Sequence, residues 1–274
     1  MVDAVLLVLR EVLEAALIVS LLLALTSKLG LHYRWSIKGL VGGLLGSAFL
    51  AFYAPSIADT FDGIGQELLN VFLYLVVIIC VLWIGFIITH FYFLTVKINQ
   101  GVEQTIAVQK YKYTLLTMLC CVIVSFSLAR EGSEVWIYFS SFQVHSQAFY
   151  SALVGAAIGV GIGVSLGAIA YYCLVFMHQK HFIPGFLVVM TLLAGGLSLQ
   201  VAKQFLQIGL IDSNGPMWDS SFLIDEQSWA GELLYALFGY DAQPTAIQAY
   251  FYLAAALPML LTFLYCWWFA RWKK

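Results

Sequence analysis

Residues 4–26 read AVLLVLREVLEAALIVSLLLALT, an apolar run that is interrupted by the charged stretch Arg10–Glu14 (REVLE). A run of about 20 mostly apolar residues is long enough to cross the hydrocarbon core of a bilayer as one helix. Ionisable groups inside such a run are costly, at least about 2.5–3.5 kcal/mol each at the centre of a spanning helix. This stretch therefore predicts both a membrane fold and a functional site within the membrane.

The composition of the whole chain favours the same class of protein. Of its 274 residues, 62% are hydrophobic and 10% are charged, against roughly 45–50% and about 25% in soluble domains. The formal net charge of −2 provides no basic surface, which argues against nucleic acid as a partner. The five cysteines lie inside apolar runs without a CxxC pair, so we expect them to pack as small hydrophobic residues.

Seven stretches are long and apolar enough to span a bilayer. They are Ala4–Thr26, Gly39–Ile57, Leu68–Thr95, Tyr113–Ser140, Tyr150–Met177, Phe182–Gly209 and Ala246–Ala270. In the long polar connection 210–245, Ser228–Tyr240 is amphipathic and predicts a short helix along the membrane interface. We expect an all-α integral membrane protein with one transmembrane domain over residues 1–274 and no cleavable signal peptide.

The charges outside these stretches divide by side. Ten basic residues fall in alternate connections or after the last span: Lys28, Arg34, Lys38, Lys97, Lys110, Lys112, Lys180, Arg271, Lys273 and Lys274. Ten acidic residues fall on the opposite side: Asp3, Asp59, Asp62, Glu67, Asp212, Asp219, Asp225, Glu226, Glu232 and Asp241. Because Lys and Arg are enriched in cytoplasmic loops, we expect a cell-membrane protein with its N-terminus outside and its C-terminus in the cytoplasm.

Apart from Glu103 in a connection and Lys203 near the outer end of the sixth span, six charges remain, and they form two copies of one pattern. Residues 130–134 (REGSE) repeat the arrangement of residues 10–14 (REVLE) 120 positions later. Glutamates three apart lie on one face of a helix, and an arginine four before the second glutamate can pair with it. Four carboxylates are hard ligands that suit a hard, highly charged cation. The alternative is a structural role, in which one Arg–Glu ion pair from each motif only holds helices together. That role leaves the second glutamate of each motif unexplained.

The two motifs can meet, because the first and fourth spans run in opposite directions. Both motifs lie about 10–13 Å from the outer ends of their helices. Such an arrangement is typical of an inverted repeat of three helices plus three, with the site at the repeat interface. Repeat one would cover about residues 1–96 and repeat two about 113–209, followed by the outer loop 210–245 and the seventh span 246–270. Glycines in the second and fifth spans fit the same repeat of 120 positions, since adding 120 to Gly43 gives Gly163.

At these two motifs the sequence resembles the high-affinity iron permease family, the oxidase-dependent iron transporters of fungi and their bacterial counterparts. The family pattern is Arg-Glu-Xaa-Xaa-Glu in the first and fourth of seven spans. Further similarity lies in Gly65–Asn70 (GQELLN), Trp218-Asp219, Leu237–Tyr240 (LFGY) and Pro244-Thr245, so the resemblance extends over almost the whole chain. One departure is Val12, where the family usually has Gly. The larger side chain alters packing beside the site but leaves every proposed ligand in place.

The resemblance implies a permease, not an enzyme, that imports iron handed over by an extracytoplasmic oxidase or iron-binding protein. The expected ligands are Glu11, Glu14, Glu131 and Glu134, with Arg10 and Arg130 balancing their charge. Iron is then the transported substrate, and no organic cofactor is expected. Four carboxylates favour ferric iron by charge, but they also suit ferrous iron or manganese, so the cation and its oxidation state stay open.

Three further residues are weaker candidates. Glu67 and Asn70 lie where the third span enters from outside and are candidates for a vestibule, with helix capping as the alternative. His90, towards the inner part of the same span, is a candidate for the exit step, although packing or an interfacial position is favoured.

Two other functions stay open. One is a carrier of another di- or trivalent cation, such as manganese. The other is a membrane subunit of an electron-transfer complex. The scarcity of histidines within the spans disfavours the second, because a haem-bearing membrane cytochrome needs paired histidines. The oligomeric state is not predicted.

Overall fold

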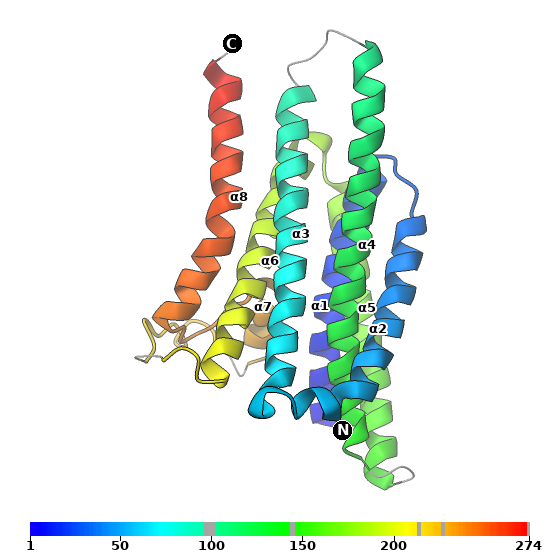
Figure 1. The fold of residues 1–274 in the computed structure, drawn as a ribbon, viewed down its shortest axis with the longest axis vertical. Coiled ribbons are helices and arrows are strands. Elements are labelled where there is room, and N and C mark those ends of the chain that lie inside the picture. Colours follow the sequence, from blue (N-terminus) through cyan, green and yellow to red (C-terminus); the bar gives the residue numbers. More distant parts are fainter. Residues whose placement is uncertain (96–101, 143–145, 213–214, 226–227, 273–274) are drawn as a thin grey trace.

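The computed structural model describes residues 1–95, 102–142, 146–212, 215–225 and 228–272. Within these ranges, long helices stand side by side in a bundle (Figure 1). The long helices are α1 Val2–Lys28, α2 Arg34–Ala58, α3 Gly65–Thr95, α4 Val102–Ser140, α5 Gln147–Phe176, α6 Gln179–Gln207 and α8 Ala246–Trp272. Two short helices, η1 Phe61–Gly63 and α7 Trp229–Phe238, lie in the connections before α3 and before α8.

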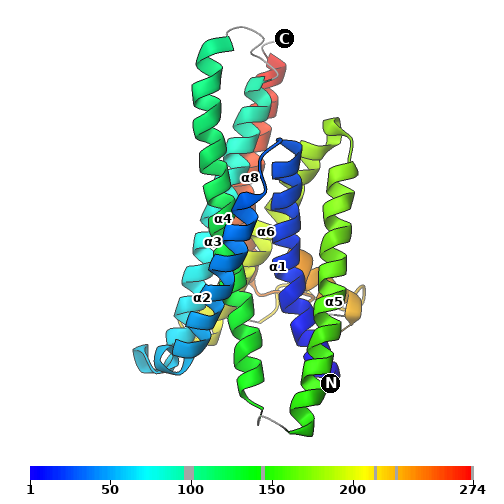
Figure 2. The same ribbon diagram turned by 90° about the vertical axis from the view of Figure 1, so that its right-hand side faces the viewer.

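Each predicted span coincides with one long helix, and the ends shift by a few residues. The largest difference is α4, which begins at Val102 rather than Tyr113 and projects beyond α3 (Figure 2). Six helices, α2 to α6 and α8, contain segments long and apolar enough to cross a membrane. The remaining long helix, α1, has a similar length, but its middle carries the charges of residues 10–14.

Successive long helices run in alternating directions, so the two termini lie at opposite ends of the bundle (Figure 1). We call these the N-terminal end and the C-terminal end. The last turns of α1, α3 and α5 and the first turns of α2, α4 and α6 lie at the C-terminal end, and most of the predicted basic residues fall at or near these helix ends. Four residues of the predicted charge asymmetry, Lys97, Glu226, Lys273 and Lys274, lie outside the described residues.

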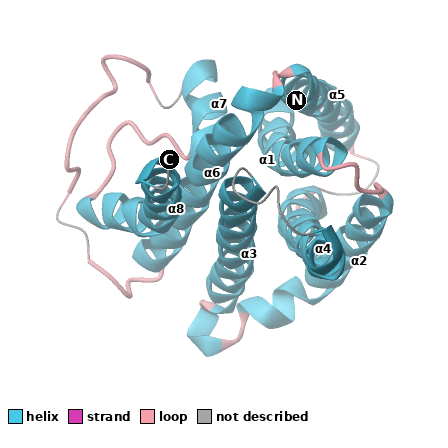
Figure 3. Cartoon of the chain, turned by 90° about the horizontal axis from the view of Figure 1, so that it is seen from above, coloured by secondary structure: helices cyan, strands magenta, loops and turns pink. Residues whose placement is uncertain are grey.

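Two helix pairs pack in the same way. Helix α5 lies along α1, and α2 lies along α4 (Figure 3). A Cβ atom placed on Gly155 would lie 3.1 Å from Cβ of Ala4, and one placed on Gly39 would lie 3.1 Å from Cβ of Val124. Glycine is therefore what lets the helices in each pair approach so closely.

These contacts correct one detail of the predicted repeat. Gly43 faces residues 125 and 128 of α4, and Gly159 faces residues 5 and 8 of α1. The helices that carry the motifs are thus offset by 120 positions, but the glycine helices are offset by 116. Gly43 corresponds in its packing to Gly159 and not to Gly163, because the stretch of chain from the charged motif to this packing glycine is four residues shorter in the second half, about one helical turn.

The predicted amphipathic segment forms α7, which packs against α1 and α6 at the N-terminal end instead of lying free along the interface. Its first turn is capped by Ser228, whose hydroxyl accepts a hydrogen bond from the Gly231 amide at 3.1 Å. Its last turn ends at Gly239, which has φ +67°. A Cβ on Gly239 would lie 2.4 Å from Cα of Gly196 in α6, so only glycine fits there.

Candidate metal centre

Arg130 lies between the two charged motifs, which the bundle brings together. Its guanidinium lies 3.0 Å from Oε2 of Glu14 in α1 and 3.0 Å from Oε1 of Glu134 one turn along α4. It also forms an ion pair with Glu131. The Arg130 side chain is only 6% exposed, so water screens these ion pairs little. One arginine therefore holds carboxylates from both motifs.

Glu14 accepts hydrogen bonds from three helices. Besides Arg130, its donors are Nε of Arg10, at 3.5 Å, and Nε2 of Gln200 in α6, at 3.4 and 3.5 Å from the two carboxylate oxygens. The amide oxygen of Gln200 in turn accepts a hydrogen bond from the Tyr74 hydroxyl of α3. The Tyr74 ring also lies 4.2 Å from Cζ of Arg130, a cation–π contact. Tyr74 and Gln200 thus fix both members of the central ion pair.

Glu11 and Glu131 form the other contact between the motifs. Both are buried, Glu11 on α1 and Glu131 on α4, and their carboxyl groups lie close enough to interact electrostatically. Ionised carboxylates accept hydrogen bonds but donate none. The second oxygen of Glu131, Oε2, is buried and has no hydrogen-bond partner. This pair is rich in acceptor oxygens and short of donors, an environment that a bound cation would satisfy.

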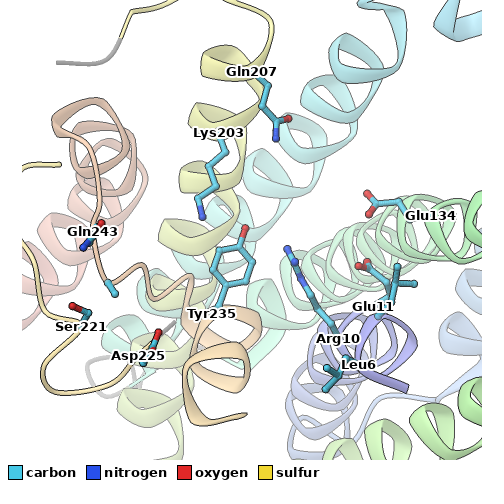
Figure 4. Close-up of a pocket in the computed structure, with 12 residues that line it drawn as sticks. Leu6, Arg10, Glu11, Glu134, Lys203, Gln207, Ser221, Asp225, Tyr235 and Gln243 are labelled. Atoms are coloured by element: carbon cyan, nitrogen blue, oxygen red, sulfur yellow. The ribbon is translucent and has the colours of Figure 1, made fainter. Parts of the chain in front are cut away.

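A cavity of about 900 Å³ leads to the site from the N-terminal end of the bundle. It is lined from α1, α4, α6, α7 and the loops before and after α7 by Leu6, Leu7, Arg10, Glu11, Glu134, Lys203, Gln207, Ser221, Asp225, Tyr235, Ala242 and Gln243. Figure 4 shows Glu11 and Glu134 together at one side of this cavity, with Arg10 beside them. Glu134 is 35% exposed and Arg10 is 43% exposed, unlike the buried Arg130.

The opposite side of the site is closed by hydrophobic side chains. Between the motifs and the C-terminal end, α1, α3, α4 and α6 pack through a core that includes Leu22, Leu25, Ile84, Ile123 and Phe186. Each of these side chains is almost completely buried. The site is thus accessible from the N-terminal end and sealed towards the C-terminal end.

Helix α7 is fixed over the cavity by charged contacts. The Tyr235 ring lies between Arg10 and Lys203, 4.4 Å from Cζ of the first and 4.4 Å from Nζ of the second (Figure 4). Lys203 also pairs with Asp241 at 2.9 Å. These contacts attach α7 and the segment after it to α1 and α6.

The loop before α7 is itself folded. The Met217 amide donates to the Pro244 carbonyl and the Ser220 amide to the Ala242 carbonyl, each at 2.8 Å. Hydrogen bonds from Ser221, and further from Gln243, hold the pKa of Asp219 below its usual range. The cavity wall formed by this loop is therefore an ordered part of the fold.

The four predicted ligands do not form a ready metal cage. Within the part of the chain that the structure describes, no three Asp, Glu, His or Cys side chains are placed to hold a metal ion. The physical reason is Arg130, whose guanidinium occupies the space between Glu14, Glu131 and Glu134. A cation that binds all of these carboxylates must displace it.

The weaker candidates lie apart from this centre. Glu67 and Asn70 are half-buried on the first two turns of α3, with Oε2 of Glu67 buried and unpaired. His90 is exposed and stacks on Phe86, with ring centroids 6.0 Å apart. It follows Tyr74 by about 24 Å along α3 at 1.5 Å per residue, so the structure does not bring it to the glutamates.

Sequence reasoning missed Tyr74, Gln200 and Tyr235. The position of Gln200 inside an apolar span was the available signal, because an amide in a spanning helix is expected to pair with another polar group. The two tyrosines carry no such signal, since aromatic residues near span ends usually mark the membrane interface.

Comparison with known proteins adds to this geometry. Residues 1–272 match the iron permease FTR1 family. The chain is 26% identical over 264 residues to the ferrous iron permease EfeU of Escherichia coli O6:H1 strain CFT073, which covers 94% of this chain and 93% of the relative. The EfeU proteins of Shigella sonnei strain Ss046 and Escherichia coli O157:H7 match with the same identity and coverage. No solved structure matches the chain.

Proposed function

Because the chain belongs to the iron permease FTR1 family, a family of multi-pass membrane transporters and not of enzymes, we propose that it imports iron through the site around Arg130. The observation that carries this proposal is the position of Arg130, 3.0 Å from carboxylates of both motifs. Its guanidinium takes the place of a bound cation. Iron would displace it and be held by Glu11, Glu14, Glu131 and Glu134.

The cavity supports a direction for this transport. With the N-terminal end outside, as the distribution of Lys and Arg predicts, the cavity of about 900 Å³ is the outer access route. Glu134 and Glu11 line it and would meet the cation first. Arg130 would then leave Glu14, while the Tyr74 ring, 4.2 Å away, keeps a favourable contact with the displaced charge.

Release to the inside requires a second conformation, because hydrophobic side chains close that side. The matched packing of α5 on α1 and of α2 on α4 supports an inverted repeat, in which exchange of the two halves would open the inner side. Delivery of iron by an oxidase or iron-binding protein stays a prediction.

We propose ferrous iron as the cargo. The four glutamates and two arginines carry a formal charge of −2, which a divalent ion neutralises, and the curated relatives are named ferrous iron permeases. The ferric ion, expected from the number of carboxylates, is the alternative. Manganese is a second alternative, since its divalent ion accepts the same oxygen ligands.

The test uses the full chain in liposomes that contain an iron chelator. We expect radioactive iron to accumulate when ascorbate keeps it ferrous, and not when it is offered as ferric citrate with a membrane-impermeant ferrous chelator.

Glu14→Gln and Glu131→Gln should each abolish uptake. Asp3→Asn, an exposed carboxylate of the same helix α1, is the matched control and should transport normally. Uptake of ferric iron alone would overturn the ferrous assignment, and full uptake by both glutamate variants would overturn the site. Excess manganese tests the second alternative by competition.

A further inference from the structure

A second polar track lies between α3 and α6, outside the centre around Arg130. The hydrogen bond from Tyr74 to Gln200 fixes the register of these two antiparallel helices. In antiparallel helices this register predicts Asn70 near the level of Gln204, one turn towards the N-terminal end of the bundle. A further turn in the same direction predicts Glu67 near the level of Gln207. Residues 67, 70 and 74, and residues 200, 204 and 207, follow the three- and four-residue spacing that places side chains on one helix face.

Two acceptor oxygens on this track have no donor. Oε2 of Glu67 and Oε1 of Gln204 are both buried from solvent and make no hydrogen bond with any described residue. A buried acceptor without a donor costs about 1–3 kcal/mol. A donor or a positive charge would satisfy each oxygen, and one of the two belongs to a carboxyl group.

The track is connected to the cavity and to the metal centre. Gln207 lines the cavity, and Figure 4 shows it one turn from Lys203 on α6. At the other end, Gln200 donates to Glu14. Glu67 precedes Tyr74 by two turns, about 10 Å at 1.5 Å per residue. A cation between Glu67 and Gln204 would therefore lie beside the path from the cavity to Glu14.

We propose that Glu67, Asn70, Gln204 and Gln207 form a second, weaker cation site through which the cargo passes on its way to Glu14. This inference rests on the proposed function. One carboxylate and three amide oxygens are hard ligands that suit a partly hydrated divalent ion. These four residues carry a formal charge of −1, so we expect them to bind the cation more weakly than the four central glutamates do. Weaker binding allows the cation to move on to Glu14. The competing explanation is a protonated Glu67 that donates to Gln204, a purely structural contact.

Glu67→Gln separates these two explanations. A glutamine amide can replace a protonated carboxyl group as the donor to Gln204, so a structural contact would survive, whereas a cation site would lose its only charge. We expect Glu67→Gln to raise the KM for ferrous iron uptake by about tenfold, with maximal rate within twofold. Gln204→Glu adds a second carboxylate and should lower the KM. Asp59→Asn, which removes an exposed carboxylate at the same end of the bundle, controls for general electrostatic attraction.

A binding measurement makes the two proposals distinguishable. Mn²⁺ bound to the purified full chain is counted by electron paramagnetic resonance. We expect two classes of site, of which Glu67→Gln removes the weaker and Glu14→Gln the tighter. Two classes that both persist in Glu67→Gln, or an unchanged KM, would overturn the second site alone. Absence of the tight class from the unmodified chain would overturn the proposed function.

Discussion

Val12 packs against Gly163, so that a Cβ atom on this glycine would lie 2.8 Å from Cγ1 of Val12. In the other half of the bundle the glycine lies on the helix that carries the motif. There a Cβ on Gly132 of α4 would lie 2.8 Å from Cβ of Ser47 of α2. In each pair one member must be glycine. The departure of position 12 from the glycine of the iron permease pattern is thus accommodated by the glycine opposite.

Enlarging Gly163 should destabilise the chain. We expect Gly163→Ser to cost about 1–3 kcal/mol, the usual cost of an overpacked contact, and to lower the thermal midpoint of the protein in detergent. Gly161→Ser is the matched control on the same helix, because nothing lies within 4 Å of a Cβ there. Val12→Gly combined with Gly163→Ser recreates the arrangement of Gly132 and Ser47 and should recover most of the loss. Equal midpoints for the two single serine variants would contradict this account.

Removing the central guanidinium should be more damaging than removing its counterpart in the first motif. Arg130→Gln leaves buried carboxylates unpaired, which costs about 3–5 kcal/mol. Arg10→Gln should cost much less, since that side chain is 43% exposed. Unfolding of both variants in denaturant measures the difference. Adding Glu134→Gln to Arg130→Gln should recover part of the stability, and the interpretation fails if it does not.

Tyr74 should position the site without touching the cargo. In Tyr74→Phe the ring under Arg130 remains, but the hydrogen bond to Gln200 is lost, which is worth about 0.5–1.5 kcal/mol. We expect iron uptake in liposomes to fall by about two- to tenfold, with folding retained. Tyr172→Phe, at a residue that is 55% exposed, should have no effect. An unchanged rate in Tyr74→Phe would show that Gln200 needs no support from α3.

The attachment of α7 depends on Gly239. Gly239→Ala introduces a Cβ 2.4 Å from Cα of Gly196 in addition to backbone strain at φ +67°. We expect α7 to separate from α6, and a cysteine placed at the buried Ala242 to react faster with a maleimide. Gly215→Ala shares the strain, with φ +90°, but its added Cβ meets no atom within 4 Å. Similar labelling rates in the two backgrounds would assign the effect to strain alone.

The helices were predictable because apolar length is a direct requirement of the bilayer. Where a helix continues beyond the membrane, this signal stops. Residues 102–112 of α4 (VEQTIAVQKYK) are mostly polar, so hydropathy places the beginning of the span at Tyr113, although the helix begins at Val102.

The charged motifs were also predictable, but the different surroundings of their two arginines were not. Residues 10–14 and 130–134 share one pattern, which gives Arg10 and Arg130 the same expected role. In the structure Arg130 is buried among three glutamates, whereas Arg10 lines the cavity beside Tyr235. The difference arises from the neighbours, since α3 packs on α4 and α7 packs on α1. No local pattern in either motif encodes those neighbours.

The ion pairs of Arg130 also bear on the return half of a transport cycle. A carrier whose binding site became strongly anionic after release would move charge through the membrane potential on its return, which changes the energy of that step by about 2.3 kcal/mol per charge per 100 mV. The Arg130 guanidinium, 3.0 Å from Glu14 and from Glu134, supplies a counter-charge that belongs to the protein itself and stays with the site after the cation is released. In the proposed transport cycle this counter-charge would make the return step less sensitive to voltage, and a monovalent cation would find the carboxylates already paired with Arg130.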